Sequence, residues 1–193
     1  MRIVNRISVV ALLVTGPLSA QTKQPSRQRT IAEALDSWIT NTETHVVPAA
    51  DALPADKYGF APPTGYGDFS GVRTFAQQVK HLAANNYWMA GLISRERPSA
   101  EESNETGPDS VQSKAQIMAY LAGSFAALHR AVKSIDADNV VAPVQNDGSW
   151  QTTRLSFAAD AVAHSFDHYG QLVEHLRMNG IIPPDSRQAA TRR

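Results

Sequence analysis

Four long stretches of the sequence carry apolar residues three or four positions apart, the period of an α-helix with one buried face. They lie at about 30–53, 70–97, 109–135 and 153–179. No run alternates apolar and polar residues as a half-buried strand requires. Amphipathic helices of similar length bury these faces against one another, so the sequence predicts an all-α fold, a four-helix bundle.

Local signals place the ends of these helices. Thr30 and Glu33 form a T-x-x-E capping box at the start of the first helix. Ser70 and Asp109 are the N-caps expected for the second and third. Pro48 lies within the first apolar pattern, where we expect it to kink or interrupt the helix.

Length and composition favour one globular domain with a sizeable core. The chain has 193 residues, of which 42% are hydrophobic and 19% charged. Lys plus Arg and Asp plus Glu both number 18, so no basic excess indicates nucleic acid as a partner. There is no cysteine, so the protein can form no disulfide, and a metal site would use nitrogen and oxygen ligands only.

The N-terminus has the layout of a secretory signal peptide. Arg2 and Arg6 precede an apolar run that Gly16-Pro17 breaks, and Ala20 marks the expected cleavage site. The run is too short for a stable membrane anchor. We therefore expect a signal peptide at 1–20, a flexible lead-in at 21–29, the bundle at 30–184 and a flexible tail at 185–193. The expected location is exported, either periplasmic or secreted.

His164 and His168 lie four residues apart in the pattern H-S-F-D-H. Four residues is slightly more than one helical turn, so both imidazoles project from nearly the same face, beside the apolar stripe. Two imidazoles so placed can hold one metal ion, as in H-E-x-x-H helices, although the glutamate of that motif is missing here. Such a pair is also often incidental, so a metal site needs a third ligand. His81 lies beside the stripe of the second helix and could meet the pair inside a bundle.

Three segments of the sequence form a recognisable set: DKYGFAP at 56–62, F-x-x-x-V-x-H-L at 75–82 and HSFDHYGQLVEHLRMNGIIPP at 164–184, of which the last is the most specific. Together they resemble the DinB/YfiT-like metal-binding helical bundles. The resemblance covers about residues 31–184. It implies a divalent metal held by His81, His164 and His168. It also implies a long crossover between the second and third helices, which the loop at 98–109 could provide.

Several alternatives stay open at this level. The resemblance implies a thiol-dependent transferase, whereas a metal-bound water would suit a hydrolase. A non-catalytic metal-binding or stress-related bundle is the alternative. Zn²⁺, Ni²⁺ and Fe²⁺ all accept three imidazoles. A small molecule is the expected substrate, and a homodimer is left open by the apolar helix edges.

Two further side chains on the same helix are candidates for a role at the site. His175 extends the histidine row, but it lies about 10 Å along the helix from His168 and cannot share an ion with His164. Asp160, one turn before His164, could orient the second nitrogen of a ligand, or it could be a solvated surface carboxylate.

Overall fold

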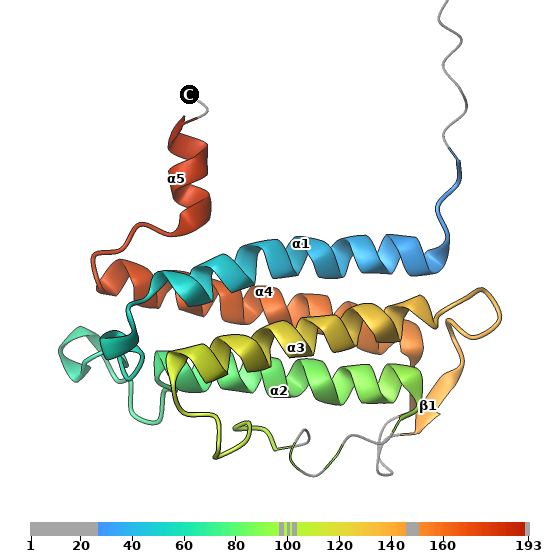
Figure 1. The fold of residues 1–193 in the computed structure, drawn as a ribbon, viewed down its shortest axis with the longest axis horizontal. Helices are drawn as coiled ribbons and strands as arrows, with labels where there is room; N and C mark the ends of the chain where they lie inside the picture. The colour runs from blue at the N-terminus through green and yellow to red at the C-terminus, as the bar shows by residue number, and fades with distance from the viewer. Residues whose placement is uncertain (1–26, 97–98, 100, 102–103, 146–150, 192–193) are drawn as a thin grey trace, which may run out of the picture.

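The computed structural model describes residues 27–96, 99, 101, 104–145 and 151–191 (Figure 1). The predicted signal peptide and its cleavage site lie outside these residues. Four long helices form the body of the molecule: α1 (Ile31–Ala52), α2 (Phe75–Ser94), α3 (Lys114–Lys133) and α4 (Arg154–Met178). The predicted all-α helical bundle is confirmed.

The helix directions define the topology of the bundle. In Figure 1, α1 and α4 run one way and α2 and α3 run the other. Each of the four helices packs against two of the others: α2 against α3 and α4, and α1 against α3 and α4. Because α2 and α3 are parallel, the chain between them must return along the whole bundle. The long crossover implied by the resemblance is therefore present.

Capping boxes set the starts of the first three helices. Thr30 caps α1 as predicted, but α2 and α3 begin after Thr74 and Ser113 and not after Ser70 and Asp109. Thr74 and Ser113 each have a glutamine three residues on, whose side chain accepts a hydrogen bond from the backbone N–H of the capping residue. The loop before α2 also provides acceptors, because the carbonyls of residues 58 and 60 bond the first N–H groups of the helix.

Pro48 does not interrupt α1, which continues to Ala52. A proline in a helix removes one backbone hydrogen bond and crowds the preceding turn. Here Ala49 and Ala50 are completely buried, so tertiary packing holds the last turn in place. The core is contributed by all four helices, and its largest fully buried side chains include Ile39, Leu82, Met89, Phe75, Phe125, Leu128 and Leu172.

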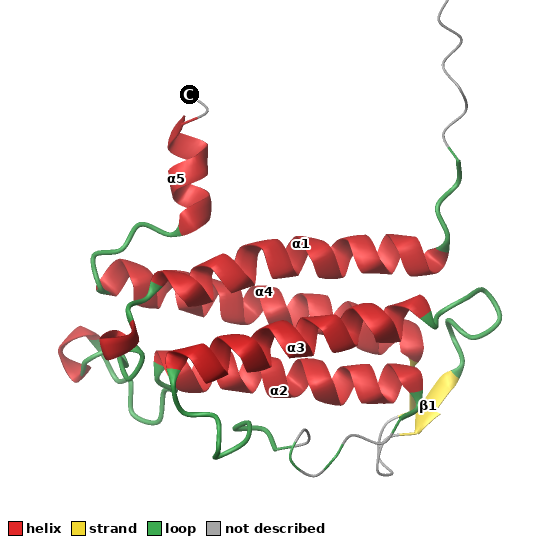
Figure 2. Cartoon of the chain, viewed as in Figure 1, coloured by secondary structure: helices red, strands yellow, loops and turns green. Residues whose placement is uncertain are grey.

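Three short elements differ from expectation (Figure 2). Strands β1 (Pro143–Gln145) and β2 (Gln151–Thr153) pair antiparallel just before α4, although the sequence predicted no strand. They are too short to show an alternating pattern. The expected flexible tail instead contains helix α5 (Pro184–Thr191), because proline also suits the first turn of a helix. The Tyr169 hydroxyl donates a hydrogen bond to Asp185 and ties α5 to α4. None of the helices described is long and apolar enough to cross a membrane.

Candidate metal centre

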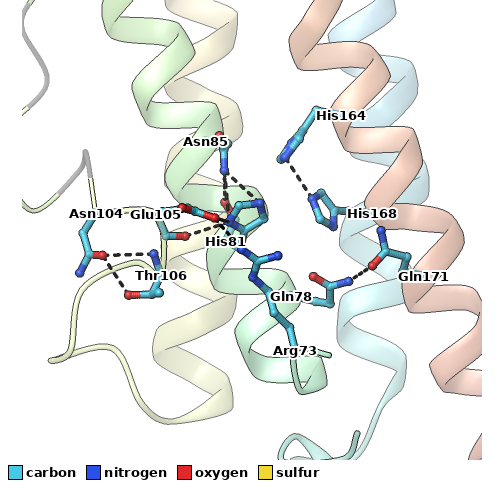
Figure 3. A network of polar contacts seen from close by, with 10 residues as sticks. All are labelled: Arg73, Gln78, His81, Asn85, Asn104, Glu105, Thr106, His164, His168 and Gln171. Atoms are coloured by element: carbon cyan, nitrogen blue, oxygen red, sulfur yellow. Dashed lines mark hydrogen bonds and ion pairs between the residues drawn. The ribbon is translucent and has the colours of Figure 1, made fainter. Parts of the chain in front are cut away.

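Three histidines meet between α2 and α4. His81 lies on α2, and His164 and His168 lie one turn apart on α4 (Figure 3). The ring centroid of His81 is 5.3 Å from that of His164 and 4.9 Å from that of His168. One ring nitrogen from each residue lies within 4.8 Å of the other two. The structure thus brings together all three residues that the sequence selected as ligands.

The helical spacing of the α4 pair aims both rings at one point. The Nε2 atoms of His164 and His168 are 3.0 Å apart. Their Nδ1 atoms are buried and have no hydrogen-bond partner in the protein. Packing between the helices therefore fixes these two rings, with the Nε2 atoms facing the centre of the cluster.

A backbone carbonyl fixes the ring of His81. Its Nδ1 donates a hydrogen bond of 2.9 Å to the carbonyl oxygen of Glu105, in the crossover loop. Since a carbonyl only accepts, Nδ1 carries a proton, and in the neutral tautomer this leaves the lone pair on Nε2 free. The Asn104 side chain holds this loop, because its Oδ1 accepts from the backbone N–H of Thr106 and its Nδ2 donates to the carbonyl of Gly107. Histidines that bind metals commonly have such an outer partner.

Asn85 is also near His81 but leaves the free nitrogen accessible. Its Nδ2 is 3.3 Å from Nδ1 and 3.2 Å from Nε2 of the ring, and 3.1 Å from the backbone oxygen of His81. An atom almost equidistant from both ring nitrogens at this range must lie over the ring face, because an in-plane position would clash with Cε1. It does not block the Nε2 lone pair.

The α4 imidazoles are neutral at physiological pH. Burial, reinforced by His164 and His81, lowers the pKa of His168 to about 4. Burial and the neighbouring His81 also lower the pKa of His164. Neutral imidazole is the form that binds metals, so both lone pairs are available without loss of a proton.

The donor set fits a divalent transition metal. Three imidazole nitrogens suit Zn²⁺, Ni²⁺ and Fe²⁺. In the described part of the chain, no further histidine or acidic side chain joins this group. The site therefore has the three-ligand composition that leaves coordination positions for water or another small ligand.

The sequence model of the DinB superfamily matches residues 39–172, which include all three histidines. The chain belongs to the DinB superfamily. No curated protein matches the sequence.

Asp160 does not hydrogen bond to a histidine of this DinB bundle. It is exposed, whereas the Nδ1 of His164 is buried and unpartnered. Its carboxylate acts on His164 only through charge, by opposing the lowering of the pKa of that histidine. The outer partner of the cluster is instead the Glu105 carbonyl, which no motif in the sequence identifies because any residue carries a backbone oxygen.

The other histidines of this DinB bundle lie outside the cluster. His175 is 4% exposed, and its ring packs near those of Phe60 and Phe75. His129 bridges helices through Asp36 at 2.6 Å and Glu43 at 3.1 Å. The exclusion of His175 from the ligand set agrees with this geometry.

Proposed function

We propose that the protein binds one divalent metal ion through His81, His164 and His168. The observation that carries this proposal is the convergence of three imidazole nitrogens within 4.8 Å of one another. The lowered pKa values of the α4 histidines and the carbonyl that orients His81 support it. Zn²⁺, Ni²⁺ and Fe²⁺ are the candidate ions.

We further propose that the site is catalytic and acts on a small molecule as a metal-dependent transferase or hydrolase. A bound divalent ion would supply Lewis acidity and lower the pKa of a coordinated water or thiol. The protein's part is to hold three imidazoles in fixed positions and to keep a proton on Nδ1 of His81, against the Glu105 carbonyl.

One observation favours a non-catalytic metal-binding bundle as the second candidate. His81 and His168 are 7% and 5% exposed, so access to the cluster is restricted. A bundle that binds an ion without turnover would need no more access than this. The two functions differ in turnover. If the metal-loaded protein converts a substrate and a variant that lacks one of the three histidines does not, the catalytic function is supported.

Metal analysis of protein purified without a histidine tag tests the binding function. We expect about one equivalent of a divalent metal in the wild-type protein and a strong loss in His168→Ala. His45→Ala is the matched control, because His45 is half-buried on α1 and outside the cluster. Equal metal contents in the three proteins would overturn the proposal.

Export is a separate proposal that rests on the basic and apolar layout of residues 1–20. It disfavours a small thiol as cosubstrate, because exported compartments are oxidising. Mass spectrometry of the protein from its native cells should find an N-terminus near Gln21 in the exported fraction. An intact Met1 in the cytosolic fraction would contradict this.

A further inference from the structure

Polar side chains line one side of the histidine cluster. Three side chains lie in a row next to the rings of His81 and His168 (Figure 3). They are Arg73 just before α2, Gln78 on α2 and Gln171 on α4. Among the described residues, no member of this row hydrogen bonds to a ring of the cluster, so the three histidines do not depend on the row for their positions. A polar wall beside three imidazoles is the kind of surface that orients a bound molecule.

Arg73 reaches the edge of the cluster. Its Nη2 lies 2.6 Å from Oε1 of Glu105, and the same oxygen is 3.7 Å from Nδ1 of His81. The guanidinium is also close enough to contribute to the lowered pKa values of His164 and His168. A positive charge thus lies beside the proposed metal position.

The carboxylate that now pairs with Arg73 is weakly held. The Glu105 side chain is 70% exposed and that of Arg73 is 37% exposed. Exposed ion pairs contribute little stability, since water and salt screen them. The backbone carbonyl of Glu105, not its carboxylate, positions His81, so the carboxylate can leave Arg73 without removing that support.

Gln78 presents a buried acceptor that lacks a donor. The Gln171 Nε2 donates to Asp167 at 2.9 Å, which leaves the Gln171 Oε1 to accept from the Nε2 of Gln78. This chain of hydrogen bonds fixes the amide of Gln78, whose Oε1 is buried without a partner although the residue is only 2% exposed. An orphaned buried acceptor beside a candidate site is explained if a ligand donor completes it.

We propose that the molecule acted on at the three-histidine site is a small carboxylate, whose anionic group pairs with Arg73 in place of Glu105. Glu105 already shows that a carboxylate suits this position, and the planar guanidinium matches that group better than an ammonium would. A hydroxyl or N–H group of the same molecule would donate to Gln78. This inference rests on the proposed metal-binding function.

The test compares two thiols on the Co²⁺-loaded full chain. Mercaptoacetate and 2-mercaptoethanol are similar in size but differ in the carboxylate. Each is titrated, and the thiolate-to-cobalt absorption band reports binding. The quantity of interest is the ratio of the two affinities in each protein, because differences in thiol pKa and in direct chelation then cancel between proteins.

We expect Arg73→Gln to lower the preference for mercaptoacetate about fivefold, as the loss of a partly exposed ion pair should. Glu105→Gln should raise it, since the competing carboxylate is gone while the backbone carbonyl remains. Arg130→Gln is the control of equal charge change, because Arg130 is exposed in the last turn of α3, at the opposite end of the bundle (Figure 1).

The outcomes separate this inference from the proposal beneath it. Cobalt binding with an affinity ratio that Arg73→Gln leaves unchanged would overturn the carboxylate inference alone. A decrease that is equal in Arg130→Gln would also overturn it, because net charge would then explain the effect. Failure of the wild-type protein to bind cobalt would overturn the metal function and this inference together.

Discussion

The Nε2 atoms of His164 and His168 lie 3.0 Å apart, with both rings aimed at the same point. With histidine–metal bonds of about 2.0–2.1 Å, two imidazoles on one ion have nitrogens about 2.9 Å apart at right angles and about 3.3 Å apart at the tetrahedral angle. The observed separation lies between these values. The pair is therefore preorganised for a shared ion and needs only small ring movements to hold it.

Metal should stabilise the wild-type protein and not His168→Ala. A ligand that binds only the folded state contributes about 2.7 kcal/mol at one hundred times its Kd. For a chain of this size we expect a rise in Tm of about 5–10 °C on saturation with the preferred ion. Calorimetry with and without metal measures this rise. His45→Ala should respond as the wild type does, and a similar rise in His168→Ala would argue against the histidine site.

Asn104→Ala should weaken metal binding although Asn104 touches no ligand. Its side chain holds the turn that presents the Glu105 carbonyl to His81. Loss of an outer partner of a metal ligand typically costs 10–100-fold in affinity, so we expect a decrease of about tenfold. Competition with a chromogenic chelator measures the affinity.

Asn139→Ala provides a matched control for this prediction. Asn139 also bonds backbone groups of its own turn, through Asp136 N–H and the carbonyl of Ser134, but it lies in the connection after α3. Its loss should leave metal affinity unchanged. If both variants lose affinity equally, a general loosening of loops and not the Glu105 carbonyl would be responsible.

The sequence predicts the parts of the site that depend on helix geometry. An i,i+4 pair on one helix face puts His164 and His168 together whatever the rest of the fold does. The approach of His81 depends on the packing of α2 against α4. Its place beside the apolar stripe of the second helix made that approach possible, and the resemblance to a known family implied it. Glu105 acts through its backbone oxygen, which every residue type carries, so the sequence does not indicate its role.

The start of α2 was also open in the sequence, because Ser70 and Thr74 are both good N-caps. The carbonyls that favour a start at Phe75 come from a loop whose path tertiary packing decides.

Thr74→Ala should destabilise the protein more than Ser70→Ala. The Thr74 hydroxyl accepts from the backbone N–H of Gln77 and completes the capping box of α2, so its loss should cost about 1 kcal/mol. Ser70 lies outside the helix and hydrogen bonds Asp68 in an exposed turn, so its loss should cost a few tenths of a kcal/mol at most. Urea denaturation of both variants measures the difference. Equal losses would contradict the assigned start of α2.

His175 should make the stability of the metal-free protein depend on pH. Burial beside two phenylalanine rings lowers the pKa of His175 in the folded state. In the unfolded chain its pKa returns to about 6.5. Between the lowered value and about 6.5 the unfolded state binds more protons, so stability is full above pH 6.5 and falls as the pH drops below it.

Replacing His175 with leucine isolates this contribution. Leucine fills the buried position without a titratable group, so His175→Leu should lose less stability between pH 7 and pH 5 than the wild type does. Urea denaturation in the presence of a chelator, repeated across this range, gives the free energy of unfolding of both proteins. His164 and His168 titrate in both, so their contributions cancel in the difference. Two curves that stay parallel would show that His175 becomes charged in the folded protein without cost, in conflict with its burial among Phe60 and Phe75.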